Sequence, residues 1–331
     1  MRLPATRGPV SEEVVRLLRG ASPAEGLDLG PAQPAVHDED LQLSLWICYE
    51  LGYRGFDDVD PDQDGGLAFY ALRKDLEKRW LTGLTDLVAP VEADPADVPR
   101  ALARLAAADD GPSLAKFLQR KASAAQFGEF VAHRSVYHLK EADPHSWAIP
   151  RLSGRAKAAL VEIQADEYGG GRVEEMHSEL FRTTMRSLGL DDGYGHFVDD
   201  VPAVTLAVSN LMSLFGMNRR WLGAALGHLA AFEMTSSLPN RRYGNGLRRL
   251  GGDPAATRFF DVHVEADAVH EQIAAHDLCG SYAAEHPEAA GDILFGAACG
   301  LAVDAEFAAH LLGSWEAGLP SLRTRALSGA A

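Results

Sequence analysis

The sequence predicts an all-α protein. Apolar residues recur at intervals of three and four along most of the 331-residue chain, which is the spacing of one helix face. The sequence lacks sustained alternation of apolar and polar residues with Val, Ile and Thr enrichment, the pattern that predicts strands. Hydrophobic residues make up 47% of the chain and charged residues 24%, as in a globular protein with a large core.

The predicted elements follow one another between stretches rich in Gly, Pro and Asp. Residues 1–36 are rich in Pro, Gly and Ala and are expected to form a flexible N-terminal arm with one short helical pattern at 12–18. Gly169–Gly171 predicts a break or kink. Helices are expected over residues 38–53, 67–87, 98–107, 114–124, 127–141, 155–166, 173–188, 201–215, 220–234, 240–250 and 254–277, with one or two more over 286–312.

Charge and cysteine content limit the functional classes. The net charge of -16 argues against nucleic acid and anionic membranes as partners. Cys48, Cys279 and Cys299 lie far apart and form no CxxC pair, so neither a zinc ribbon nor a disulfide framework is indicated. The N-terminus lacks the apolar run of a signal peptide, and no uninterrupted apolar stretch of membrane-spanning length is evident. We therefore expect a soluble cytoplasmic protein.

Residues 259–270 carry the first candidate chemistry. A helix turns about 100° per residue, so His263, Asp267 and His270 project from one face over two turns. Borderline transition metals accept this mixture of imidazole and carboxylate, whereas Ca²⁺ and Mg²⁺ prefer oxygen alone. The alternative is a solvated polar face, because further glutamates lie nearby.

Two further segments supply carboxylates. Glu174 and His177 have the i, i+3 spacing of ligands in carboxylate-bridged helical bundles, and Glu167 precedes Glu174 by two turns. Glu141 ends an apolar-faced helix and is the third candidate. Each segment also has an ordinary explanation, since acidic helices contain Glu-x-x-His by chance and a terminal glutamate is often exposed.

The combination is more specific than any one segment. Four carboxylates and three imidazoles exceed the ligands of a single zinc ion and suit two iron or manganese ions that share carboxylates. Nucleophile chemistry is not indicated, because the sequence has no GxSxG motif and none of its cysteines lies in a Cys/His context. Gly169–Gly171 also lacks the preceding strand and following Lys-Ser/Thr of a phosphate-binding loop.

At these residues the sequence resembles the heme-oxygenase-like di-iron oxidases and oxygenases, the iron-containing redox enzymes. Besides Glu141, Glu167-Tyr168-Gly169-x-Gly171, Glu174-x-x-His177 and the 263–270 segment, the resemblance rests on Tyr49–Phe56, Asn210–Phe215, Ala231–Ser236 and Pro239–Tyr243. It implies a single heme-oxygenase-like domain over 37–331, with accessory helices (37–112) and a metal-binding core (113–315). The implied ligands are Glu141, Glu174, His177, His263, Asp267 and His270, with Glu167 as a further carboxylate.

The resemblance also implies two iron ions, dioxygen as co-substrate, an external electron donor and a homodimer. The extra carboxylate at Glu167 resembles the members that oxygenate amine nitrogen, so N-oxygenation of a small amine is the expected reaction. An oxidase that desaturates or cleaves a fatty or amino acid is the first alternative. Two others are a non-catalytic helical protein that binds a small molecule or metal, and a heme-binding protein.

His228 and Glu233 have two interpretations: they face the cavity, or they form a hydrogen-bonded pair in the core. The Arg241-Arg242 and Arg248-Arg249 pairs could bind a substrate carboxylate or form a solvated face.

Overall fold

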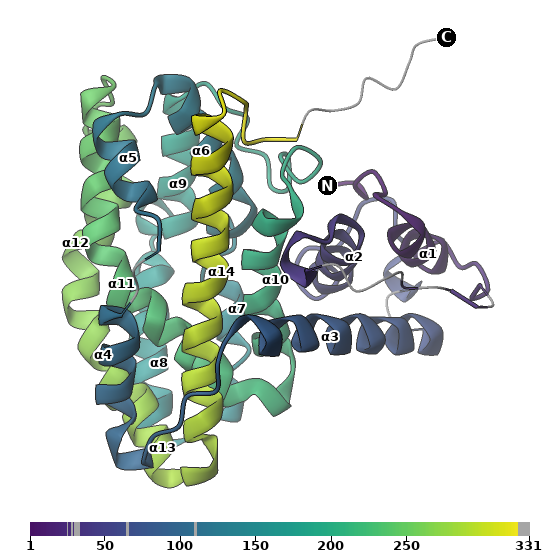
Figure 1. The fold of residues 1–331 in the computed structure, drawn as a ribbon, viewed down its shortest axis with the longest axis horizontal. Helices are drawn as coiled ribbons and strands as arrows, with labels where there is room; N and C mark the ends of the chain where they lie inside the picture. Colours follow the sequence, from purple (N-terminus) through teal and green to yellow (C-terminus); the bar gives the residue numbers. More distant parts are fainter. Residues whose placement is uncertain (25, 28, 30–33, 64–65, 109–110, 324–331) are drawn as a thin grey trace.

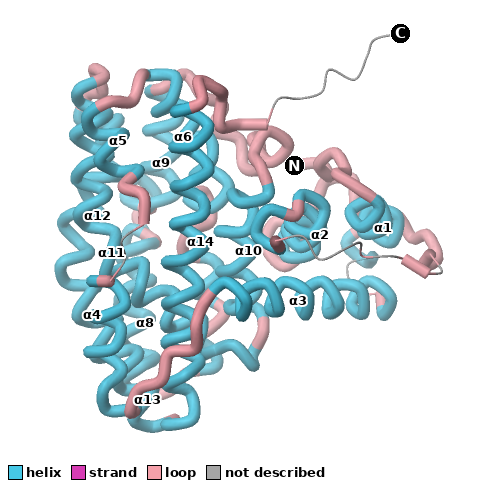
Figure 2. The backbone as a smooth tube through the Cα atoms, in the orientation of Figure 1, coloured by secondary structure: helices cyan, strands magenta, loops and turns pink. Residues whose placement is uncertain are grey.

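The computed structural model describes residues 1–331 except 25, 28, 30–33, 64–65, 109–110 and 324–331, and it leaves out the side chains of residues 265–268. Every regular element in this described part is a helix, and no strand occurs there (Figure 2). The predicted all-α class is confirmed. Long helices stand side by side in a bundle, and the N-terminal helices pack against one side of it, with α3 running across the direction of the bundle (Figure 1).

The helices divide into an N-terminal group and the bundle. The N-terminal group comprises α1 (Pro9–Leu18), α2 (Glu39–Glu50) and α3 (Leu67–Leu87). Two short helices follow, α4 (Val98–Ala107) and α5 (Leu114–Arg120). The rest are α6 (Ala124–His138), α7 (Asp143–Ser146), α8 (Gly154–Glu167), α9 (His177–Ser187), α10 (Ala203–Met217), α11 (Leu222–Arg249), α12 (Pro254–Gln272), the π-helical η8 (Ile273–Gly280), α13 (Ser281–Glu285) and α14 (Ala290–Glu316).

Helix α11 lies at the centre of the bundle, since it packs against α5, α10, α12 and α14. Its contact with α14 is close because glycines remove side chains where the helices meet. A Cβ atom on Gly227 would lie 1.8 Å from the carbonyl oxygen of Ile293, and one on Gly296 would lie 2.0 Å from that of Ala224. A side chain at either glycine would therefore push the two helices apart.

The segment Pro287–Glu316, which contains α14, is long and apolar enough to cross a membrane by length and composition. The sequence analysis expected no stretch of this length, and that expectation is wrong for this segment. Half of the apolar window is buried inside the protein, and α14 packs against α10 and α11. A buried core helix of a soluble bundle has the same composition, so the packing supports a soluble protein.

The N-terminal residues are more ordered than the arm predicted for 1–36. Val10, Val14 and Leu18 recur at intervals of four and are buried, and α1 packs against α2. Helix α2 is in turn joined to the bundle by an ion pair between Glu50 and Lys140, whose Nζ lies 2.8 Å from Oε2 of Glu50. Both side chains are almost fully buried, so this pair fixes the residue that directly precedes Glu141.

Two of the predicted helix boundaries that differ from the structure concern segments near the candidate site. Helix α11 continues through Pro239 to Arg249, where we predicted separate helices over 220–234 and 240–250, because a proline removes only one backbone donor and long helices accommodate it. Helix α9 begins at His177 rather than 173, since Met176 before it is extended, with φ -63° and ψ 130°.

Candidate metal centre

Two groups of potential metal ligands converge inside the bundle. Glu141, Glu167, His177 and His263 form the first cluster, and Glu167, Glu233 and His270 form the second, with ligand atoms within 4.8 Å of one another in each. We call these the first and second clusters. Glu167 belongs to both, which makes it the point where the clusters meet.

Five elements bring these residues together. Glu141 lies just after α6, Glu167 is the last residue of α8, and His177 is the first residue of α9. The second cluster adds Glu233 from α11, and α12 contributes its histidines to both clusters. Gly169, Gly170 and Gly171 all have positive φ (62°, 59° and 81°), which confirms the predicted break. A Cβ atom on Gly169 would lie 2.5 Å from the backbone carbon of Glu175, so the glycine lets the chain fold back tightly between Glu167 and His177.

Hydrogen bonds fix the orientation of the first cluster. Tyr137 donates its hydroxyl to Oε1 of Glu141 at 2.8 Å, and Nδ1 of His138 donates to the same oxygen at 3.0 Å. Nδ1 of His263 lies 2.7 Å from the carbonyl oxygen of Phe259 and must donate to it, because a carbonyl only accepts. An imidazole held through Nδ1 presents its other nitrogen to a metal, and Nε2 of His263 lies 3.8 Å from Oε2 of Glu141 in the same cluster.

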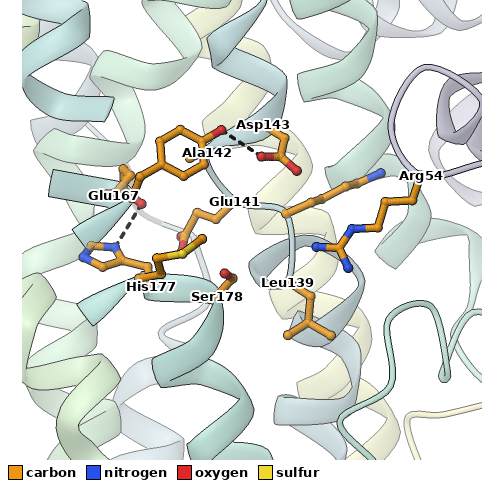
Figure 3. A pocket seen from close by; sticks show the side chains of 11 residues that line it. Arg54, Leu139, Glu141, Ala142, Asp143, Glu167, His177 and Ser178 are labelled. Carbon is orange, nitrogen blue, oxygen red and sulfur yellow. Dashed lines mark hydrogen bonds and ion pairs between the residues drawn. The ribbon is translucent and has the colours of Figure 1, made fainter. Parts of the chain in front are cut away.

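Buried atoms without hydrogen-bond partners point to a missing cation. Within the described residues these include Oε2 of Glu141, Oε2 of Glu167, Nδ1 of His177 and Nδ1 of His270. Nδ1 of His177 and Oε2 of Glu167 are 2.9 Å apart, yet neither has hydrogen-bond geometry toward the other (Figure 3). An unsatisfied buried polar group costs roughly 1–3 kcal/mol. A metal ion would satisfy these atoms together, and mixed imidazole and carboxylate donors suit iron.

The electrostatics of both clusters favour positive charge. Burial acts to raise the pKa of Glu141, but His138 and His263 outweigh it and hold that pKa well below the usual range. Burial acts to lower the pKa of His270, but the carboxylates of Glu233 and Asp166 outweigh it and raise that pKa to about 9. Nδ1 of His270 lies 3.4 Å from Oε2 of Glu233, and Nε2 lies 3.0 Å from Oδ2 of Asp166. In the metal-free protein, the positive charge of protonated His270 thus balances part of the negative charge that a metal ion would otherwise balance.

The structure brings together five of the seven ligands expected from sequence: Glu141, Glu167, His177, His263 and His270. Glu174 does not join them. It is exposed on the 3-10 turn η6 (Val173–Glu175), and because α9 begins at His177, the two residues are not one helical turn apart as the spacing predicted. Asp267 lies in α12, but its side chain is outside the described residues, so its role as a ligand stays a prediction.

Glu233 belongs to the second cluster, although the sequence analysis did not predict it as a ligand. It is 7% exposed and sits on the apolar part of α11, where burial raises the pKa of its carboxyl group. The sequence did contain a sign of this role, because Glu233 is the carboxyl group of a very apolar helical segment and such a group is costly to bury without a partner. His228 does not pair with it: its Nδ1 lies 3.3 Å from Nε2 of His145.

A cavity of about 800 Å³ opens beside the clusters and is lined by Glu141, Glu167, Glu233 and His263. Cavities of this size hold small organic ligands. Apolar side chains form much of its wall, and one ion pair adds charge, with Nη2 of Arg134 2.7 Å from Oδ1 of Asp304. Its wall also includes Met212, Leu229, Phe232, Leu301 and Ala305.

The basic pairs noted in the sequence have different surroundings. Arg242 lines the large cavity. Arg248 is held by Asp261, and Arg249 donates to the carbonyl oxygens of Leu118 and Ala122. Arg248 and Arg249 therefore connect helix α11 to α12 and to the region around α5. These contacts explain the pair of arginines without a role in binding a substrate carboxylate.

Comparison with known proteins identifies the family. A profile described as iron-containing redox enzyme matches residues 128–305, just over half of the chain. The chain belongs to this family. The match includes all six residues of the two clusters. The description of the family names iron, which is a metal that this set of donors suits.

Two individual proteins are similar to this family member. Nitrosourea synthase from Streptomyces achromogenes subsp. streptozoticus is 29% identical over 138 residues, which is 41% of this chain and 29% of that enzyme. A domain of unknown function with a heme oxygenase-like fold, from Shewanella denitrificans OS217, superimposes with a TM-score of 0.53 at 14% identity. That comparison covers 68% of this chain and 95% of the other, and it confirms the heme-oxygenase-like fold.

Proposed function

We propose that this chain is a non-heme di-iron oxygenase that uses dioxygen to oxygenate the nitrogen of a small amine. The observation that carries the proposal is the position of Glu167, whose carboxylate belongs to both ligand clusters. A carboxylate shared between two sites is how helical bundles hold a metal pair. One ion would be held by Glu141, Glu167, His177 and His263, and the other by Glu167, Glu233, His270 and the predicted ligand Asp267.

The chain's own residues prepare the site for this chemistry. Two iron(II) ions bound there would supply electrons for the reduction of dioxygen. Tyr137 and His138 hold the Oε1 side of Glu141, which leaves Oε2 for the metal. Leu229, Phe232 and Leu301 form an apolar wall that keeps water from the substrate next to the clusters. Further reducing equivalents would come from an external electron donor.

The choice of nitrogen as the reacting atom rests on two supports. The sequence resemblance assigns the additional carboxylate, Glu167, to members that act on amines. The similar stretch of nitrosourea synthase, an enzyme named for a nitrogen-containing product, agrees with this choice. A homodimer in the cytoplasm remains our expectation.

The proposal is tested by loading the metal-free protein with iron(II) under anaerobic conditions and then admitting dioxygen. We expect about two iron ions per chain, as in carboxylate-bridged bundles. With a panel of primary amines, amino acids and fatty acids, we expect dioxygen uptake with an amine and a product in which ¹⁸O from labelled dioxygen is bonded to nitrogen, detected by mass spectrometry.

Other outcomes contradict the proposal in distinct ways. An alkene or a shortened carbon chain would support the desaturating or cleaving alternative. Iron uptake with no dioxygen consumption for any compound would support a metal-binding protein without oxygenase activity. A Soret band after addition of heme, with no uptake of free iron, would indicate a heme protein.

A further inference from the structure

A second, much smaller cavity reaches the clusters from the side of the N-terminal helices. It has a volume of about 50 Å³, and its lining includes Glu141, Glu167 and His177 of the first cluster. Arg54, from the loop after α2, and Ser178, from α9, lie on its other walls (Figure 3). The metal centre thus has a cavity on each of two sides.

The two cavities share few lining residues. Among the described lining residues, Glu141, Ala142 and Glu167 are common to both. Most of the other walls differ: α11 and α14 line only the large cavity, whereas Arg54 and Ser178 line only the small one. A molecule in the large cavity therefore leaves the small cavity free.

The size of the small cavity selects what can enter it. A water molecule needs about 10–15 Å³ of such volume, so the cavity holds roughly three to five water-sized molecules. Organic ligands occupy about 300–1,000 Å³ and are excluded. The two cavities thus divide molecules by size.

Hydrogen bonds hold the walls of the small cavity in place. The hydroxyl of Tyr168 donates to Oδ1 of Asp143 at 2.8 Å and lies 3.1 Å from Oγ of Ser146. Lys140 is held by Glu50, and the guanidinium of Arg54 lies 4.1 Å from the ring centre of Tyr194. These contacts keep the side chains from collapsing into the opening.

We propose that the small cavity is a second entrance to the metal centre, used by molecules the size of water or dioxygen while the large cavity holds the organic substrate. This inference rests on the proposed di-iron function. Its consequence is that a bound substrate does not block dioxygen, so the two reactants reach the centre independently.

The test measures entry of nitric oxide, which is neutral and has the size of dioxygen, into iron(II)-loaded protein by stopped-flow absorbance. The large cavity is first closed by labelling an Ala305→Cys variant with fluorescein maleimide before iron is added. Cys48, Cys279 and Cys299 are buried, so wild-type protein treated with the same reagent is the labelling control. We expect nitric oxide to bind the labelled protein at nearly the unlabelled rate.

Narrowing the small cavity as well should then slow binding. In the labelled Ala305→Cys background, Ser178→Leu should reduce the association rate about tenfold, equivalent to about 1.4 kcal/mol of added barrier. The matched Ser178→Ala variant should not reduce it. Ser178→Val is the smaller substitute if Ser178→Leu does not fold, and iron content per chain confirms that each variant keeps its metals.

Each remaining outcome overturns a defined claim. If the label alone abolishes nitric oxide binding, or if Ser178→Leu leaves the rate of the labelled protein unchanged, the second entrance is wrong although the metal centre stands. If wild-type protein takes up no iron, the proposed function fails, and the entrance fails with it.

Discussion

The two clusters of the candidate metal centre differ in how their ligands are held before a metal binds. In the first cluster, Tyr137 and His138 donate to Glu141, and the carbonyl of Phe259 fixes the ring of His263. In the second, His270 relies on Glu233 and on Asp166, whose side chain is 63% exposed.

This difference separates two ways of preparing a metal site. The first cluster is organised by buried hydrogen bonds, which keep the ligand atoms in place without a cation. The second is organised by charge, because the raised pKa of His270 shows a site that stabilises a proton in the metal's absence. We therefore expect the first cluster to bind iron more tightly than the second, and four experiments test this comparison.

The largest expected effect comes from the residue that the clusters share. Glu167→Gln removes the negative charge that both clusters use. We expect the variant to lose both iron ions, because neither site keeps its full set of anionic ligands. Iron content per chain after gel filtration measures this, and retention of even the first ion at wild-type affinity would show that Glu167 is not a common ligand.

Glu233→Gln should separate the clusters, because Glu233 belongs only to the second. We expect the variant to keep one iron ion per chain and lose the other. Glu174→Gln is the matched control: Glu174 is exposed and outside both clusters, so the variant should bind as much iron as wild type. If the Glu174→Gln variant lost iron and the Glu233→Gln variant did not, Glu174 rather than Glu233 would be the ligand, as the sequence resemblance implied.

Removing the residues behind the ligands should weaken each site without emptying it. Tyr137→Phe deletes one hydrogen bond to Glu141, and Asp166→Asn removes a carboxylate beside His270. Such residues typically contribute about 10–100-fold to metal affinity. Titration of iron(II) should show Tyr137→Phe weakening only the tighter phase and Asp166→Asn only the weaker one, and the reverse assignment would contradict the comparison.

The smallest expected effect is a pH dependence of the metal-free protein. The pKa of His270 is about 9 in the folded chain and 6.5 ordinarily, so its proton stabilises the fold fully below about pH 6.5 and progressively less as pH rises to about 9. We expect the free energy of unfolding to fall by about 2 kcal/mol over this range, less than the full linkage value because Asp166 is exposed to solvent. Urea titrations of wild type and His270→Gln measure the difference, and equal pH profiles would rule out this charge stabilisation.

Local sequence patterns predicted the fold class and most of the centre. The spacing of His263 and His270 on one helix face made both of them candidates, because residues three, four and seven apart share a helix face, and the combination with the other segments predicted a metal site. Glu141 and Glu167 were also candidates, each at or near the end of a predicted helix, and the structure brings both of them to the first cluster.

The remaining assignments depended on contacts that spacing does not encode. Glu174 was chosen because it stands three residues before His177, but the turn after Gly169–Gly171 leaves it on the surface and starts the helix at His177. Glu233 reaches the second cluster only because α11 packs against α12. The helical pattern at 12–18 was predicted, but its packing was not, since α1 is held by its partner α2 and a pattern within one segment does not encode that contact.

The ion pair between Glu50 and Lys140 limits how far the enzyme can be shortened. The stretch that the family profile matches, 128–305, keeps Lys140 but would leave its carboxylate partner behind. The same cut removes Trp46 and Tyr53, whose ring centres lie 5.7 and 4.4 Å from Nζ of Lys140, so it exposes the surface that α2 covers on the bundle. A version cut at the profile's borders should therefore be poorly soluble, because the face of α10 that packs against α2 is apolar and would meet water.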